Sequence, residues 1–204
     1  MMDRTLKNIS SVMLEGRGIT LEPLSQEHLP GLEKAAESAE IWPYMTTNLA
    51  KENTLGSWLE EAQKLEQVGQ QLPFAIRLST SGTVIGSTRF LNIVPEHRRL
   101  EIGWTWLARE QWGGRANFAA KLLLFQHAFE VLNAQRVELR TDALNKRARR
   151  AIAKLGATEE GNLHSHMIMP GGRVRNSVQF AIIDTDWPRV KAALTERLSN
   201  KDST

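Results

Sequence analysis

Residues 100–124 read LEIGWTWLAREQWGGRANFAAKLLL, and this stretch decides the fold that we predict for the chain. Every second residue from Leu100 to Trp106 is apolar or aromatic, which is the alternation of a β-strand. From Phe118 onward the apolar residues recur at helical spacing instead. Gly113 and Gly114 stand between the two patterns. The stretch therefore predicts a strand, a tight glycine turn and a helix.

A glycine turn in front of a helix is a candidate site for an anion. Glycines let backbone N–H groups approach a phosphate closely, and the helix N-terminus adds unpaired donors and the positive end of the helix dipole. The turn lacks the patterns of a P-loop and of a Rossmann dinucleotide site, so we expect a different phosphate-bearing ligand. The alternative is a plain strand-to-helix connection, because short glycine motifs occur often by chance.

The turn sequence QWGGRA at 111–116 resembles the pyrophosphate loop [QR]-x-x-G-x-[GA] of the GNAT superfamily of acetyl-CoA-dependent N-acetyltransferases. It is most similar to the Rim-type group, which acetylates the N-termini of ribosomal proteins. In a second alignment, to the W-G-x-G of that group, Arg115 stands where a glycine is expected. The resemblance implies that acetyl-CoA is the cosubstrate and is bound by Leu107, Gln111, Trp112, Gly113, Gly114, Arg115, Ala116, Asn117, Asn145 and Arg150.

A second segment, NKRARRAIAKLGA at 145–157, resembles the superfamily pattern N-x-x-[AS]-x-x-L-Y-x-K-x-G-F over its whole length. Many relatives protonate the departing CoA thiolate with the tyrosine of this pattern or with a serine. Here those positions hold Ile152 and Ala148, which cannot donate a proton. The general acid is therefore unidentified. The arginines at 147, 149 and 150 either are solvated or contact CoA phosphates.

The resemblance implies roles for further residues. Glu101 is the candidate base that takes a proton from the amine through water, and the alternative is an ion pair with Arg98 or Arg99. Asn145 either contacts pantetheine and orients that water or only caps a helix. Because the first two helices and their connection border the acceptor site in this superfamily, the acceptor amine is assigned to Trp42, Tyr44 and Arg98. The alternative for the 41–45 cluster is packing.

Composition limits the remaining possibilities. The chain has 204 residues, and we expect one N-acetyltransferase-like domain over 19–198, an N-terminal extension over 1–18 and a disordered tail over 199–204. Cysteine is absent, and no signal peptide or membrane span is visible, so we expect a soluble cytoplasmic protein. The 26 basic residues are interleaved with 23 acidic ones and do not form a basic tail or patch in the sequence. We therefore expect no nucleic-acid partner.

The rest of the chain predicts an α+β domain with a mixed, mostly antiparallel sheet flanked by helices. The expected strands are 19–24, 74–78, 84–94, 100–107, 134–141, 157–169 and 174–183, and the expected helices are 25–38, 54–68, 118–132, 145–155 and 187–198. The strand, helix and strand over 100–141 form the one expected parallel crossover.

The leading hypothesis is an enzyme that transfers acetyl from acetyl-CoA to a primary amine by direct attack in a ternary complex. The amine belongs to a protein N-terminus or a small molecule. The alternatives are a non-catalytic CoA-binding sensor or scaffold and a basic protein associated with RNA or the ribosome. No metal is expected, because His164 and His166 share a predicted strand face without a third ligand. A homodimer is compatible with the sequence.

Overall fold

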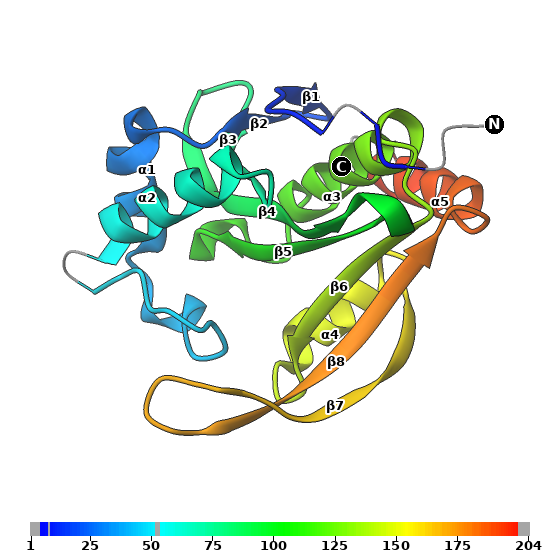
Figure 1. Ribbon diagram of the computed structural model, residues 1–204. Helices are drawn as coiled ribbons and strands as arrows, with labels where there is room; N and C mark the ends of the chain where they lie inside the picture. Colours follow the sequence, from blue (N-terminus) through cyan, green and yellow to red (C-terminus); the bar gives the residue numbers. More distant parts are fainter. Residues whose placement is uncertain (1–4, 8, 52–53, 200–204) are drawn as a thin grey trace.

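An eight-stranded mixed sheet runs through the computed structural model, which describes residues 5–7, 9–51 and 54–199 (Figure 1). Its strands follow the order β1-β2-β3-β4-β5-β6-β8-β7. The strands are β1 (Leu14–Gly16), β2 (Ile19–Pro23), β3 (Leu72–Leu78), β4 (Val84–Val94), β5 (Arg99–Leu107), β6 (Arg136–Asp142), β7 (Thr158–Ile168) and β8 (Val174–Ile183). Neighbouring strands are antiparallel except β5 and β6, which are parallel.

Helices cover both faces of the sheet. The helices are α1 (Leu29–Ala36), α2 (Thr54–Gln67), α3 (Ala116–Gln126), α4 (Lys146–Ala153) and α5 (Trp187–Ser199). One buried cluster joins the sheet to α3 and α5, and a second joins it to α1 and α2. The predicted helix over 118–132 begins earlier, at Ala116, and its last turn is a π-helix over His127–Val131. The α+β architecture predicted from the sequence is confirmed.

The ends of the chain were expected to lie outside the domain. Within the extension over 1–18, β1 pairs with β2, and the backbone N–H of the buried Leu6 donates to the carbonyl of Pro95. This part of the extension therefore packs against the sheet. Residues 200–204 of the expected tail lie outside the described residues. The predicted division into extension, domain and tail stays a prediction.

The parallel strands β5 and β6 pair over only three residues each and then diverge. The pairs run from Arg99 with Arg136 to Glu101 with Glu138, and no further pair follows in the described residues. Figure 1 shows the resulting V between β5 and β6. One edge of β5 beyond Glu101 is consequently free of a neighbouring strand, and its backbone is available to a ligand.

A β-bulge in β5 reverses the alternation that the sequence predicts. Gly103 pairs with Arg89 and Trp106 pairs with Ser87, so two residues of β5 stand opposite one residue of β4. Trp104 lies within the bulge with a left-handed φ of 50°. Before it, Leu100 and Ile102 pack in the α3 cluster, whereas after it Trp106 packs in the α2 cluster. The prediction of one uninterrupted alternation was therefore wrong, because the extra residue exchanges the two faces.

Candidate active site

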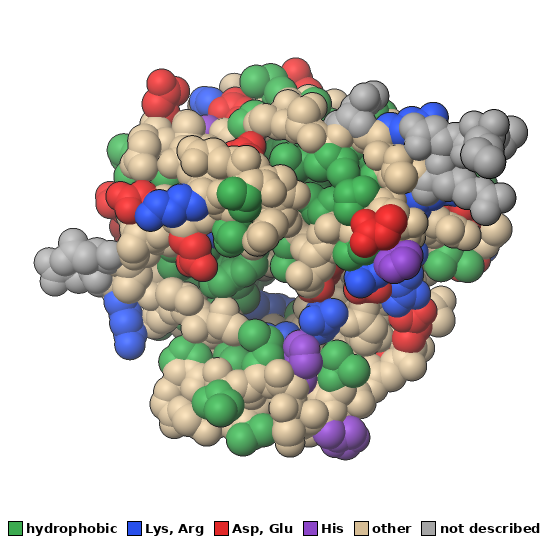
Figure 2. Space-filling view, viewed as in Figure 1, with side chains coloured by type: hydrophobic (Ala, Val, Ile, Leu, Met, Phe, Trp, Pro, Cys, Tyr) green, Lys and Arg blue, Asp and Glu red, His purple; other side chains and the backbone are tan. Residues whose placement is uncertain are grey.

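A cavity of about 570 Å³ occupies the divergence of β5 and β6. Its walls come from the strands β4, β5 and β6, the glycine turn, α3, α4, the connection between α1 and α2, and the hairpin of β7 and β8. Figure 2 shows its opening above that hairpin, with Lys, Arg and His side chains gathered at the edge. The charged residues of the lining are Glu101, Lys121, Arg140, Arg147 and Arg175.

The glycine turn forms one end of the cavity. Gly113 lines it with a left-handed φ of 76°, a conformation that glycine adopts without steric cost. The Trp112 indole Nε1 donates to the carbonyl of Leu107 at 3.0 Å, which fixes the turn against the end of β5. The helix α3 begins directly after this turn, at Ala116. The first N–H groups of a helix have no partner within the helix, so this end of α3 suits an anion.

The later half of the predicted loop does not reach the cavity. Gly114, Arg115 and Ala116 are outside its lining, whereas Gln111, Trp112, Gly113 and Asn117 belong to it. Arg115 instead donates from Nη2 to the carbonyl of Leu198 on α5. The guanidinium of Arg115, which aligns with a glycine of the W-G-x-G pattern in the second alignment, thus binds the end of α5.

The three arginines of α4 differ in position. Arg147 lines the cavity, and its guanidinium carbon lies 3.1 Å from the centre of the Trp112 ring. Partial burial lowers the Arg147 pKa, and the neighbouring Arg109 lowers it further. Arg149 pairs with Glu159 at 3.2 Å, and Arg150 is exposed outside the lining. Arg147 is therefore better placed for an anion than Arg150, which the sequence favoured.

The rest of the α4 wall is apolar and contains Ala148, Ala151 and Ile152. The positions that hold serine or tyrosine in relatives thus face the cavity without a proton donor. Asn145 caps α4, since its Oδ1 accepts from the Ala148 N–H at 3.0 Å. The cap interpretation of Asn145 is confirmed, and the residue also lines the cavity.

Glu101 lies deep in the cavity and is only 5% exposed. Its Oε2 accepts from the Asn92 Nδ2 at 2.8 Å and lies 3.5 Å from the Arg140 Nη2. The suggested ion pair with Arg98 or Arg99 was wrong, because Arg98 binds Asn133 and the Glu101 carboxylate faces Arg140 on the neighbouring strand β6. Arg99 instead lies 3.8 Å from Glu138.

Lys121 is a cavity residue that the sequence interpretation missed. It lies on α3, is 4% exposed, and donates from Nζ to the Thr105 Oγ1 at 2.6 Å. Burial lowers its pKa to about 7. The available signal was a lysine inside the apolar run of 119–125, since a lysine is rarely buried without a reason.

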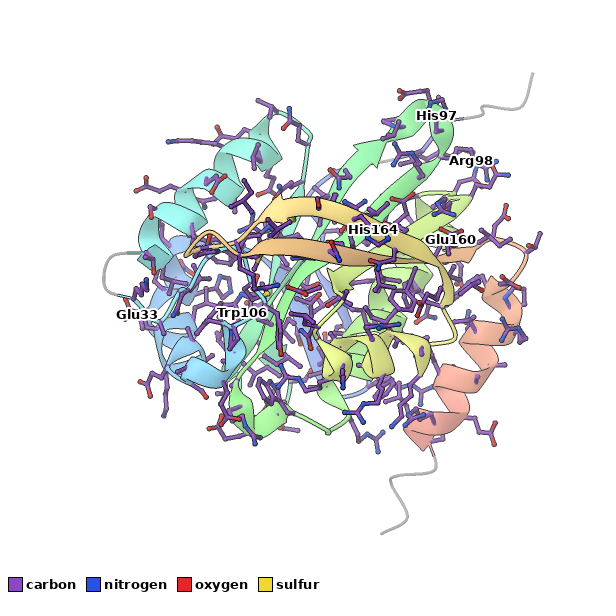
Figure 3. All side chains as sticks on the ribbon, turned by 90° about the horizontal axis from the view of Figure 1, so that it is seen from below. Glu33, His97, Arg98, Trp106, Glu160 and His164 are labelled. Carbon is purple, nitrogen blue, oxygen red and sulfur yellow. The ribbon has the colours of Figure 1, made fainter. Side chains whose placement is uncertain are left out.

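The residues assigned to the acceptor separate into two groups. Tyr44 lines the cavity, whereas Trp42 is buried beside it, where Nε1 donates to the Ala36 carbonyl at 2.9 Å. Trp42 also packs on Trp106 with ring centres 5.3 Å apart, so its observed role is packing. Arg98 lies in the turn between β4 and β5 and donates to the backbone carbonyl and the side-chain Oδ1 of Asn133. Figure 3 places Arg98 beside His97, far from Trp106, and the cavity lining does not contain it.

The strands β6, β7 and β8 contribute a polar cluster that the sequence did not reveal. His166 Nδ1 lies 3.0 Å from the Ser177 Oγ, and its Nε2 lies 3.5 Å from the Arg140 Nη1. Arg175 donates from Nε to the same Ser177 Oγ at 2.8 Å. Burial and the two arginines lower the His166 pKa, which disfavours the charged imidazolium.

The two histidines of β7 do not share a face as predicted. Ser165 between them is left-handed with a φ of 48°, and the pairing with β8 is irregular from Leu163 to Met167. His164 is exposed, whereas His166 lines the cavity. Within the described residues, no group of three or more His, Cys, Asp or Glu side chains is arranged to hold a metal ion.

Comparison with known proteins matches this geometry to one family. Residues 19–158 match the family of the acetyltransferase (GNAT) domain. The chain belongs to the GNAT acetyltransferase family. A GCN5-related N-acetyltransferase from Brucella melitensis is 28% identical with a TM-score of 0.88, over 97% of this chain and 90% of the other.

Two curated relatives support the same activity. The uncharacterized N-acetyltransferase p20 of Bacillus licheniformis is 25% identical over 83% of this chain and 94% of its own length. YdaF of Bacillus subtilis (strain 168), named as a candidate ribosomal N-acetyltransferase, is 27% identical over 52% of this chain and 57% of its own. This GNAT protein is therefore an acetyl-CoA-dependent N-acetyltransferase. Among its described residues, no helix is both long and apolar enough to cross a bilayer.

Proposed function

We propose that this GNAT enzyme acetylates a primary amine, on a protein N-terminus or a small molecule, by direct attack in a ternary complex. One observation carries the proposal. A single cavity connects the glycine turn and the N-terminus of α3 with the buried carboxylate of Glu101. A phosphate-bearing cosubstrate and an amine can therefore occupy its two ends together. The name of YdaF favours the Rim-type group, whose acceptors are protein N-termini.

Acetyl-CoA would lie along the free edge of β5. Its diphosphate fits the turn at Trp112 and Gly113, where Arg147 adds a positive charge. Gln111, Asn117 and Asn145 line the path from this turn into the cavity. When acetyl-CoA is bound, its thioester supplies the activated acetyl group. A backbone N–H of β5 near Leu107 is our candidate donor to the oxygen that becomes negative.

Glu101 would accept the proton that the amine must lose, because only a neutral amine attacks a carbonyl carbon. Asn92 and Arg140 hold this carboxylate in one position, so a water between it and the amine would be well oriented. The proton for the departing thiolate has no donor on α4. Tyr44 lines the same cavity, and Tyr44→Phe tests whether its hydroxyl supplies that proton.

Thiol release from acetyl-CoA, measured with peptides, polyamines, amino acids and aminoglycosides, tests the proposed function. We expect turnover with at least one class of amine, and binding of CoA in calorimetry. Binding of CoA without turnover on any amine would instead support the sensor or scaffold. RNA binding that weakens steeply with salt, without affinity for CoA, would support the RNA-associated alternative. A homodimer and a cytoplasmic location stay predictions from the sequence.

A further inference from the structure

Arg175 is a charged residue of the cavity lining that has few protein partners for its hydrogen-bond donors. It lies on β8, is 8% exposed, and lines the cavity on the side of the hairpin of β7 and β8. Its Nε donates to Ser177, but its two terminal nitrogens make no hydrogen bond to any residue in the described ranges. Within those ranges it also makes no ion pair within 4.0 Å.

The nearest carboxylates are already engaged by other groups. Asp142 attracts Arg175, but its Oδ2 accepts from Arg173 at 2.6 Å and its Oδ1 accepts from the Leu144 N–H at 2.9 Å. Glu101 lies beside Arg140 at 3.5 Å. The acceptor side of the cavity thus has two guanidinium groups and one carboxylate in its lining.

A buried guanidinium is costly unless a charge or hydrogen bonds compensate it. Its flat array of donors matches a carboxylate with two parallel hydrogen bonds, which makes carboxylates its preferred partners. Burial lowers the Arg175 pKa, yet a guanidinium stays protonated at neutral pH. The unused donors of Arg175 therefore have the chemistry of a carboxylate site beside the proposed base.

The position of this arginine is fixed by other side chains. Ser177 binds both Arg175 and His166, and His166 in turn lies 3.5 Å from Arg140, which lies 3.5 Å from Glu101. A continuous series of polar contacts thus connects the proposed base with the unused guanidinium. Arg175 also pairs across the hairpin with Met167, which lines the cavity too.

We propose that the acceptor amine carries a carboxylate and that Arg175 binds it while the amine lies near Glu101. The carboxylate belongs either to a free amino acid or to the acidic side chain of a residue close to a peptide N-terminus. The inference rests on the proposed acetyl transfer and specifies the acceptor for it. It makes Arg175 a specificity residue that contacts the acceptor, and not a base or an acid.

The test compares matched acceptors on matched variants. The acceptors are free amino acids against their carboxamides, and tetrapeptides with Asp or Glu at the first or second position against the same peptides with Asn or Gln. The variants are wild type, Arg175→Gln, Arg175→Lys and the control Arg189→Gln. Arg189 is exposed on α5, so its substitution removes the same charge far from the lining.

Wild type should prefer the carboxylate member of one pair by about 10- to 100-fold in kcat/KM, the range expected for hydrogen bonds to a charged group. Arg175→Gln should reduce that preference to about threefold or less, mainly through a higher KM, while turnover of the neutral member changes little. Arg175→Lys should retain part of the preference, and Arg189→Gln all of it. CoA affinity, which also reports folding, should be unchanged in every variant.

The two proposals fail in different ways. If CoA binds but neither the carboxylate acceptors nor their neutral counterparts are acetylated, the proposed function fails. If neutral and carboxylate acceptors react alike in wild type, or if Arg175→Gln slows both equally, only the carboxylate site is refuted. A weaker CoA affinity in Arg175→Gln would assign this arginine to the cosubstrate instead and would also refute the inference. The two substrate series tell a free amino acid from a peptide side chain.

Discussion

The buried Lys121 gives this fold a pH-dependent stability that Lys121→Met should remove. Methionine has a similar length and carries no charge, so the change removes the ammonium group and keeps most of the volume. In the folded protein burial lowers the Lys121 pKa from 10.5 to about 7. Between these two values the unfolded chain holds a proton on this lysine and the folded protein does not. The free energy of unfolding must therefore rise as pH rises through this window.

The size of the effect follows from the two pKa values. Each pKa difference of one corresponds to about 1.4 kcal/mol. At pH 7 the lysine should cost the folded state about 4 kcal/mol, and at pH 10 less than about 1 kcal/mol. Lys121→Met should therefore be more stable than wild type at pH 7. Loss of the hydrogen bond to Thr105 should reduce this gain in stability by a small amount. That advantage should shrink by about 3 kcal/mol by pH 10.

Urea unfolding of both proteins at pH 7, 8, 9 and 10 measures this difference, because other titrating groups cancel between them. Lys64→Met is the matched control, since Lys64 is exposed on α2 and its removal should leave no pH-dependent difference. Thr105→Val keeps the lysine and should keep the slope. A difference between Lys121→Met and wild type that stays constant with pH, or that grows towards pH 10, would refute the reasoning.

Three further predictions concern the proposed active site. Glu101→Gln should lower kcat by about 10² at neutral pH with CoA affinity unchanged, and high pH should recover part of the loss because more of the amine is then neutral. If Glu101→Gln kept the kcat of wild type across the pH range, Glu101 could not be the base. Arg147→Glu should weaken CoA binding in calorimetry more than Arg150→Glu, and the difference should diminish in high salt; equal effects would count against the contact at Trp112. Gly113→Glu should weaken CoA binding beyond Gly113→Ala, which shares the strain of the left-handed backbone but adds no anion. Identical affinities in these two variants would remove the diphosphate from this turn.

The parts of the site that lie close together in sequence could be predicted. The glycine turn, the start of α3 and the cap of α4 at Asn145 each depend on residues within a few positions, and local patterns describe them well. Gln111, Trp112, Gly113 and Asn117 line the cavity as expected from the turn. Their prediction required only the order of a strand, a turn and a helix.

The acceptor side depends on pairing between distant strands. Arg140, His166 and Arg175 come from three strands that follow α3, and the cluster forms only because β8 inserts between β6 and β7. Strand order of this kind cannot be read from alternation within each strand. The ion partner of Glu101 was wrong for the same reason, since Arg140 is 39 positions away and the sequence suggested a neighbour.

Left-handed residues caused the two errors in strand alternation, and both lie in strands that contribute to the cavity lining. Trp104 in β5 and Ser165 in β7 each interrupt a strand, and each interruption changes which side chains face the cavity. A left-handed conformation costs a non-glycine residue about 1–2 kcal/mol, so other contacts must compensate it. Nothing in local sequence marks such a residue when it is a tryptophan.

For Trp104 the compensating contacts lie on the opposite face of the sheet. Its indole lies 6.1 Å from the ring of Trp58 on α2, and the Arg89 guanidinium lies 4.4 Å from the centre of the Trp58 ring and 5.2 Å from that of Trp104. Arg89 is 2% exposed and donates to Gln71 at 2.8 Å. These cation–π contacts stabilise the bulge, because a desolvated cation on an aromatic face is worth about 2 kcal/mol. The bulge in turn directs Thr105 towards Lys121 and leaves Gly103 and Trp104 on the free edge of β5. The shape of the cavity is therefore set by packing against α2, on the face of the sheet away from α3.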